Sequence, residues 1–479
     1  TPGLWSEILF HMKSRRTDID MLLSPHGSLE DSDELPEEAR ELHRQAVNDW
    51  LHFIMAEKAI LEEWIRRSSQ NPLDVSISYI ERPGNVQAIR NAQAELFGLI
   101  FRTSGRWRTA SIHLDLDGPT FDSILPYFPL QSDEYPILTN LRLSIDGNNP
   151  FDRTINGKKL TLGLIGAPNL RNLKMYNIWT SPANLDVNWE AISELELGSW
   201  NLQYGSRSSL TFLSKHVAGI LQLCPNLTRA SFCLIEDDFV DSDPLSRPPH
   251  PITHKRLRAL RFEGKEPDRD LPLHLSLPAL RELCFVPVGR VKDIDSHPII
   301  PWLTVYGAQL TDIAFIHSSI SPPGLEYVLE HLPNVSRLRI TSRPYVGSRA
   351  YNENGQIFGT PLGALTNELL GRLTPQRAGD GSWAPCLCPK LETFVCKVMA
   401  PEFNTQSLVE FIEARRGVVG GPFARIQDVE VWLALEPQID VEDVLYERGV
   451  DMSDFRLLVS GDMGFERREW DGDPNLFDL

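Results

Sequence analysis

The sequence predicts an α/β fold, an irregular leucine-rich-repeat-like solenoid (a horseshoe) with parallel strands on one face and helices on the other. A leucine motif, in which an apolar residue is followed by two more after three and then two positions, recurs along the chain. Its last two apolar residues alternate with polar ones, which is typical of a strand. Six copies have Pro two residues before the leading apolar residue. Those leading residues are Leu138, Leu170, Leu227, Leu280, Val335 and Leu391.

The motif has a direct physical interpretation. Pro removes a backbone donor and restricts the preceding residue, so it ends a helix before each strand. Each unit should therefore contain a turn, a short strand, a connection and a helix. One such unit cannot bury its apolar face alone, and stacked units can. Weaker copies begin at Leu257, Leu310 and Ile426, and the uneven steps indicate insertions. The alternative is an ordinary α/β domain.

The first part of the chain should alternate strands with helices. We expect a short strand within residues 1–10, a polar loop over 11–38, and a helix over about 38–68. Strands are expected at 73–79 and 110–114, and further helices over about 84–103 and 119–128. The inward stripe of the first helix should contain Trp50, Phe53, Ile54, Ile60, Leu61, Trp64 and Ile65.

Three predicted regions follow from this order. Residues 1–134 should form helix and strand units that cap the solenoid, residues 135–462 the solenoid itself, and residues 463–479 an acidic tail. Trp5, Trp64 and Trp107 lie at element boundaries and should seal the end of the repeat array. Arg106 and Arg108 are expected to form a salt bridge or a helix-end cap.

Two insertions have distinctive compositions. Residues 237–243 are acidic, and a solvated loop is favoured over a calcium site because the Gly and terminal Glu of a calcium loop are missing. Residues 341–360 combine aromatic residues, Arg and Gly, as binding loops often do. Many inert loops share that composition. Tyr345, Arg349 and Tyr351 are the candidate contact residues there.

Composition narrows the possible partners. The net charge of -18 argues against binding to nucleic acid or to an anionic membrane, which both favour basic patches. No apolar run approaches the ~18 residues that suggest a membrane span. No signal peptide is visible, and the start at Thr1 suggests a piece of a longer protein. The six cysteines fit reduced, buried thiols, so we expect a cytoplasmic or nuclear protein.

The sequence contains no recognisable catalytic, cofactor-binding or metal-binding motif. Cys386, Cys388 and Cys396 lack the paired spacing of zinc modules, and no His lies nearby. No nucleophile elbow, phosphate-binding loop, dinucleotide fingerprint or metalloprotease helix occurs. We therefore expect neither an enzyme nor a bound metal or cofactor.

Several segments together carry a family resemblance. They are Thr1-Pro2-x-Leu4-Trp5-Ser6, Trp64-Ile-x-Arg-Ser68 with Pro72-Leu73-x-Val75-x-Ile77, Arg106-Trp107-Arg108, the leucine motifs, and the late stretch from Leu408 to Arg416. The chain resembles the expanded family of F-box proteins with leucine-rich-repeat-like domains in mushroom-forming (basidiomycete) fungi. In that family the F-box precedes a segment like the one at Thr1, so this chain would lack it.

The resemblance implies the substrate-recognition part of an F-box subunit of an SCF-type ubiquitin ligase. The partner would be a protein substrate of unknown identity. A Skp-type adaptor and a cullin would be reached only through an upstream F-box. Polar strand positions should form the contact face: Arg142, Lys174, Glu196, Ser231, Arg261 and Arg339. The alternative is a stand-alone, non-catalytic leucine-rich-repeat scaffold or sensor with no ubiquitin role.

Overall fold

The protein is described here by a computed structural model, which divides into two compact units. Unit 1 is Thr1–Asn201 with Ser206–Leu210, and unit 2 is Leu202–Gly205 with Thr211–Leu479. The structure describes residues 7–12, 37–80, 87–116, 127–147, 154–155, 158–159, 162–176, 185–198, 214–234, 251–287, 297–316, 320–341, 366–397, 404–417, 422–433 and 437–461.

Unit 1 contains a parallel sheet whose strands pair in chain order. Its strands are β1 (Glu7–Met12), β2 (Leu73–Ile80), β3 (Trp107–Leu116), β4 (Asn140–Gly147), β7 (Asn172–Tyr176) and β8 (Glu194–Gly198). Its helices are α2 (Glu37–Ser68) and α3 (Gln87–Phe101), and its short 3-10 helices are η3 (Ser104–Arg106), η5 (Ser132–Glu134), η7 (Gly163–Gly166) and η9 (Trp189–Ala191). A small antiparallel pair joins β5 (Thr154–Ile155) and β6 (Lys158–Lys159).

Unit 2 repeats this plan with a second run of parallel strands. They are β9 (Arg229–Leu234), β11 (Ala259–Gly264), β13 (Glu282–Pro287), β14 (Asp312–Ile316), β15 (Arg337–Thr341), β16 (Thr393–Lys397), β17 (Asp428–Trp432) and β18 (Arg456–Ser460). Neighbours in this order pair in parallel. Two short strands, β10 (Ile252–Thr253) and β12 (Leu275–Ser276), also pair.

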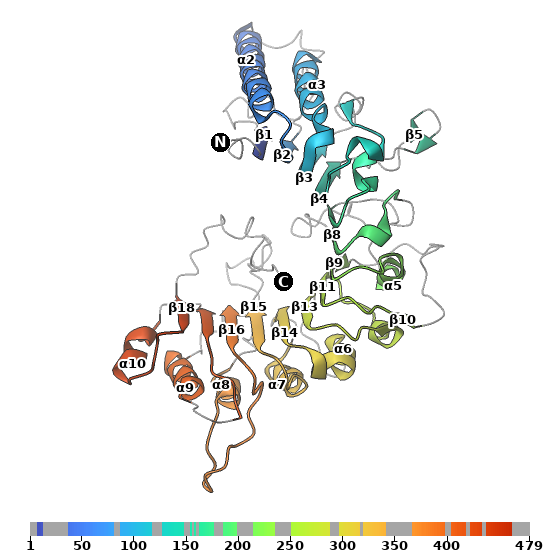
Figure 1. The fold of residues 1–479 in the computed structure, drawn as a ribbon. Helices are drawn as coiled ribbons and strands as arrows, with labels where there is room; N and C mark the ends of the chain where they lie inside the picture. Colours follow the sequence, from blue (N-terminus) through green and yellow to red (C-terminus); the bar gives the residue numbers. More distant parts are fainter. Residues whose placement is uncertain are drawn as a thin grey trace. The chain divides into compact units, whose positions relative to one another are not determined.

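Helices cover one side of the unit 2 sheet (Figure 1). They are α5 (Ser214–Leu223), α6 (Ile299–Tyr306), α7 (Pro322–Glu330), α8 (Asn367–Leu373), α9 (Thr405–Arg416) and α10 (Val441–Glu447), with the 3-10 helices η11 (Leu271–His274) and η13 (Gly307–Gln309). The prediction of a mixed α/β fold with a large parallel sheet is therefore confirmed.

The leucine motif forms the turn and strand that its spacing predicts. The leading residue closes a turn, because its N–H donates to the carbonyl oxygen three residues earlier, as from Leu170 to Ala167 at 3.1 Å and from Leu391 to Cys388 at 3.0 Å. The leading residues are fully or almost fully buried. The next apolar residues lie in register across the sheet, and in unit 2 they align Phe232, Phe262, Phe285 and Phe315 on adjacent strands.

The connections differ from the prediction in several places. Among the described residues, 3-10 turns replace the expected helices between β4 and β7 and between β7 and β8. Connection length does not explain the difference, because residues 148–171 and residues 288–311 are equally long, and the first contains the β5–β6 pair and η7 whereas the second contains α6. The expected loop over 11–38 and the expected helix over 119–128 lie mostly outside the described residues, as does the predicted tail over 463–479. The predicted boundary at residue 134 falls between β3 and β4, which pair within unit 1.

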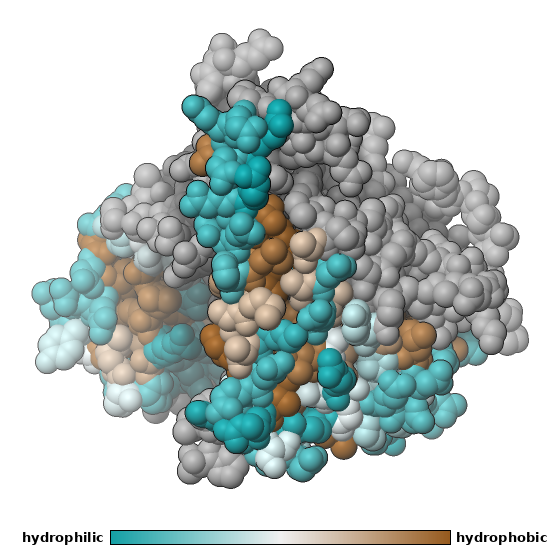
Figure 2. Space-filling view, turned by 90° about the horizontal axis from the view of Figure 1, so that it is seen from above, coloured by the Kyte–Doolittle hydropathy of each residue, from teal (hydrophilic) through white to brown (hydrophobic). Residues whose placement is uncertain are grey.

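Helix α2 has the predicted bounds but not the predicted burial. Ile54 and Leu61 are buried at 0% and 5% exposure, whereas Phe53 and Ile60 are exposed at 37% and 63%. The predicted single stripe is thus split into an inner and an outer part, because α3 packs against one side of this helix. Figure 2 shows, for the described residues on the face in view, that some hydrophobic residues reach the molecular surface, where hydrophilic residues flank them.

The boundary residues of unit 1 have structural roles. Trp107 is fully buried, and its indole N–H donates to the hydroxyl of Thr103 at 2.9 Å. Arg106 donates to the carbonyl oxygen of Asn71, just past the end of α2, at 2.9 and 3.0 Å. Arg108 forms an ion pair with Asp74. The predicted salt bridge is therefore confirmed at Arg108, whereas Arg106 bonds the loop after α2 and the Ser68 hydroxyl and not a carbonyl of the last helical turn. Trp64 is only half-buried, and Trp5 lies outside the described residues.

Candidate functional site

The candidate contact residues lie on the sheet face opposite the buried apolar side chains. Side chains alternate along a strand, so the residues between the buried positions share this other face. In unit 1, strand pairing places Arg142 beside Lys174 and Lys174 beside Glu196. In unit 2 it places Ser231 beside Arg261, and Arg339 is in the equivalent position of β15. We call this line of residues the middle row of each sheet.

The middle row of unit 1 is a connected polar cluster. The Lys174 ammonium lies 3.1 Å from a carboxylate oxygen of Glu196, and Tyr176 donates its hydroxyl to the other oxygen at 2.6 Å. The Arg142 guanidinium carbon lies 5.3 Å from the centre of the Tyr176 ring, within cation–π range. Lys174 and Glu196 keep 34% and 30% of their side-chain surface exposed. This cluster combines fixed geometry with access for a partner.

The middle row of unit 2 carries two further ion-pair groups. Arg261 pairs with Glu263 along β11. Asp312 accepts hydrogen bonds from Arg339 at 3.0 Å and from Arg337 at 3.1 Å. The Arg339 side chain is 12% exposed and that of Asp312 7%, so most of this charge is removed from water. Shared hydrogen bonds of this kind hold the two arginines in place.

Small and apolar residues close the space between those ion pairs. Cys284, Val286 and Ala314 lie on this same face of β13 and β14, yet they are buried at 0%, 6% and 3% exposure. Burial raises the pKa of the Cys284 thiol to about 11, and the nearby carboxylates add to this while Arg261 and Arg339 oppose it. The unit 2 part of the predicted contact face is therefore much less accessible than the unit 1 part.

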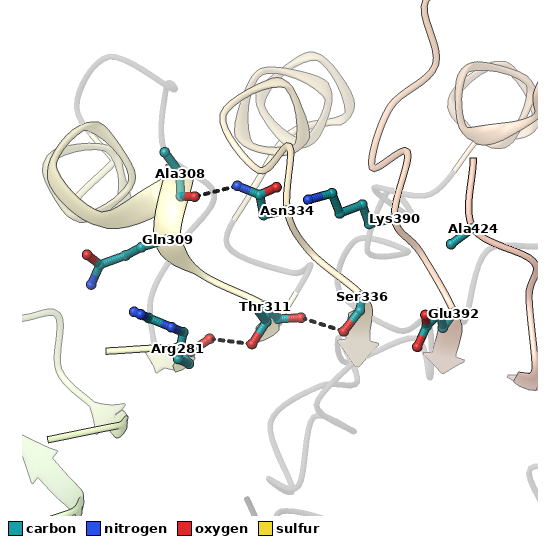
Figure 3. Close-up of a pocket in the computed structure, with 9 residues that line it drawn as sticks. All are labelled: Arg281, Ala308, Gln309, Thr311, Asn334, Ser336, Lys390, Glu392 and Ala424. Atoms are coloured by element: carbon teal, nitrogen blue, oxygen red, sulfur yellow. Dashed lines mark hydrogen bonds between the residues drawn. The ribbon is translucent and has the colours of Figure 1, made fainter. Parts of the chain in front are cut away.

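A polar groove follows the strand-start edge of unit 2 (Figure 3). Its volume is about 590 Å³. The residues that line it are Arg281, Ala308, Gln309, Thr311, Asn334, Ser336, Lys390, Glu392 and Ala424. At its floor, side-chain hydroxyls donate hydrogen bonds to backbone carbonyl oxygens of the preceding repeat within unit 2. Thr311 donates to Arg281 at 3.4 Å, and Ser336 donates to Thr311 at 3.3 Å. These hydrogen bonds, which join successive repeats within unit 2, already occupy the floor of the groove.

Two buried arginines were not expected to be structural. Arg415 is fully buried in α9 and donates to the carbonyl oxygens of Leu373 at 2.7 Å and Leu387 at 2.9 Å, among others. Burial lowers its pKa. Arg416, 4% exposed, pairs with Asp454 at 2.5 Å. Helical periodicity was the missed signal, since these positions follow Phe411 and Ile412 by one turn on the buried side.

The other expectations about sites have varied outcomes. Tyr345, Arg349 and Tyr351 lie outside the described residues, so their role stays a prediction. All six cysteines are free thiols, and five are buried while Cys386 is half-buried. Within the described ranges, no group of His, Cys, Asp and Glu side chains is arranged to hold a metal ion. None of the described helices combines the length and apolar character needed to cross a membrane.

Comparison with known proteins gives no family assignment. No protein-family model matches the chain. No curated protein matches its sequence either. Interpretation of this site therefore rests on the residues and geometry described above.

Proposed function

We propose that the chain is a protein-interaction domain in the form of an irregular leucine-rich-repeat-like solenoid. In this proposal it is the substrate-recognition part of an F-box subunit of an SCF-type ubiquitin ligase. The observation that carries the interaction role is the middle row: parallel strands in register present one side chain per strand on the face opposite the core, and in unit 1 this gives Arg142, Lys174 and Glu196. The ubiquitin role rests on the sequence resemblance alone.

A protein partner fits this surface better than a small molecule. Ligand pockets are usually concave and mostly apolar, whereas the unit 1 cluster is an open, charged strand face. Neighbouring strands lie about 4.8 Å apart, so a row across several strands matches the reach of an extended peptide or a protein surface. Cations at Arg142 and Lys174 beside the Glu196 carboxylate suit a partner of mixed charge.

The contact in this proposal is centred on unit 1. Lys174 and Glu196 are about one-third exposed, whereas Arg261 and Arg339 in unit 2 are 17% and 12% exposed and hold their own ion pairs. Rigid, partly exposed charges favour specificity because they repel partners with the wrong charge pattern. The expected location remains the cytoplasm or the nucleus, and free, mostly buried thiols are consistent with a reducing compartment.

A comparison of two forms of the protein distinguishes the ubiquitin role from a scaffold role. The complete gene product and the present chain would each be expressed with an affinity tag in the source cells and purified under the same conditions. We expect the complete product to retain a Skp-type adaptor and a cullin, and the present chain to retain neither. A complete product that retains no adaptor would contradict the ubiquitin role and would favour the stand-alone scaffold or sensor.

A further inference from the structure

Helix α2 carries a narrow line of exposed apolar side chains. Leu42, Phe53 and Ile60 are exposed at 52%, 37% and 63%. They are separated by eleven and seven residues, and with 3.6 residues per turn each step returns to within about 20° of the same direction. The three side chains therefore lie along one line of the helix. We call Leu42, Phe53 and Ile60 the outer seam.

The outer seam is distinct from the packed side of α2. Ile54 and Leu61, which are buried, point about 80–100° away from Phe53 around the helix axis. Lys58, which points about 40–60° from these two residues, forms an ion pair with Glu95 of α3 at 2.9 Å, so they lie toward α3. At the middle of the seam, the Phe53 ring stacks on the half-buried Trp50 ring, with centroids 5.1 Å apart and planes 9° from parallel. That stacking fixes the Phe53 ring before any partner arrives.

We propose that the outer seam binds the same seam of a second copy of this chain in an antiparallel two-fold pair. The helix has 32 residues, and Phe53 lies at its middle. With Phe53 on the two-fold axis, Leu42 of one copy meets Trp64 of the other, because both are eleven residues from Phe53. A two-fold interface must be self-complementary in this way.

The charges at the two ends of α2 select the antiparallel arrangement. The first turn is acidic, with Glu37 and Glu38, and the last turn is basic, with Arg66 and Arg67. In an antiparallel pair each acidic end lies near the basic end of the other helix, and the two helix dipoles are also opposed. A parallel pair would place like charges together at both ends. The existing ion pairs of Arg66 and Arg67 with Glu63 are exposed, so the arginines can exchange partners at little cost.

The first test is the molar mass of the full chain by light scattering over a hundredfold range of concentration. We expect the mass to rise from 54.2 kDa toward twice that value as concentration increases. Phe53→Glu and Phe53→Lys should each remain monomeric, because each places two like charges on the two-fold axis, and an equimolar mixture of the two should form a heterodimer. Met55→Glu, a charge at another exposed apolar position about 200° around the same helix, should still dimerise.

A second test establishes direction. Phe53→Cys should form a disulfide with its own copy under mild oxidation, while Leu42→Cys alone should not, and Leu42→Cys mixed with Trp64→Cys should. Circular dichroism would verify that each variant keeps its helix content. A wild-type mass of 54.2 kDa at every concentration, or self-linking by Leu42→Cys, would overturn the proposal. The first result would mean that a different protein covers the seam.

Discussion

Asn334 donates from its side-chain amide to the carbonyl oxygen of Ala308 at 2.6 Å, and so joins the turns of two successive leucine-motif repeats within unit 2. Asn169 makes the same contact to Pro136 at 2.6 Å in unit 1. In both cases the Asn lies between the Pro and the leading apolar residue of the leucine motif. At these two positions the Asn that follows the motif Pro thus has a definite role, since it fixes the spacing between neighbouring turns.

Replacement of Asn334 by Ala should weaken unit 2. The variant leaves the Ala308 carbonyl without this donor, and we expect a loss of about 1 kcal/mol in the free energy of unfolding. Urea denaturation would measure it. Lys390→Ala is the matched control, because Lys390 lines the same groove and is exposed. Equal stability of Asn334→Ala and Lys390→Ala would show that the amide contact contributes nothing.

Gly264 should not tolerate a side chain. Its φ is +75°, and a Cβ there would lie 2.1 Å from the carbonyl oxygen of Leu234. Gly449 has nearly the same φ, +74°, but open space around it. We expect Gly449→Ala to cost about 1–2 kcal/mol, from left-handed backbone strain alone, and Gly264→Ala to cost at least about 3 kcal/mol.

The comparison of these two glycine variants separates steric overlap from backbone strain. Thermal denaturation of both proteins under one buffer condition would give the difference. If Gly264→Ala lost no more stability than Gly449→Ala, the result would contradict the close contact between Gly264 at the end of β11 and Leu234 at the end of β9.

Arg415 should be essential for the packing of α8 and α9. Arg415→Met would leave the buried carbonyl oxygens of Leu373 and Leu387 with only the weak thiol donor of Cys386, so we expect a loss of about 3 kcal/mol. Arg415→Lys should not restore it, because an ammonium group cannot reproduce the planar fork. Arg372→Met is the control, since the exposed pairs of Arg372 with Glu326 and Glu330 should be worth at most about 1 kcal/mol. Differential scanning calorimetry of the three variants would rank them.

Cys284 should make stability depend on alkaline pH. Its folded-state pKa is raised from 9.0 to about 11 by burial, so folding favours the neutral thiol. That contribution is fully present below about pH 9 and is lost progressively as the pH rises toward about 11. The stability advantage of wild type over Cys284→Ala should therefore shrink between pH 8 and pH 10.5 in urea denaturation. A constant advantage would indicate that solvent reaches the unit 2 face.

The sequence predicts the repeating part of this fold well because the signal is local. A turn closed by Leu170 or Leu391 needs only the spacing of one motif, and each strand then pairs with its neighbour by the same rule. The helices in between are less predictable. Between β4 and β7 the described residues contain the β5–β6 pair and the 3-10 turn Gly163–Gly166, and the leucine motif carries no signal that distinguishes such a connection from a helical one.

Burial depends on contacts that are remote in sequence, and there the predictions are less accurate. Phe53 and Ile60 have the periodicity of core residues, but they are exposed, because α3 packs against another side of α2. Conversely, arginine is usually a surface residue, but Arg415 is buried, and its guanidinium donates to carbonyl oxygens 26 to 42 residues away in the sequence. The middle-row positions were found from alternation, but alternation could not show that Cys284 closes the row in unit 2.

The binding role of the unit 1 middle row can be measured directly. The dissociation constant of the protein captured by the wild-type chain would be determined by calorimetry for wild type, Lys174→Glu and Lys390→Glu. We predict a dissociation constant at least tenfold larger for Lys174→Glu, which is a loss of about 1.4 kcal/mol in binding free energy. We predict an unchanged dissociation constant for Lys390→Glu, which places the same charge on the strand-start groove. Unchanged binding by Lys174→Glu, or equal losses for both variants, would contradict the binding role of the unit 1 middle row.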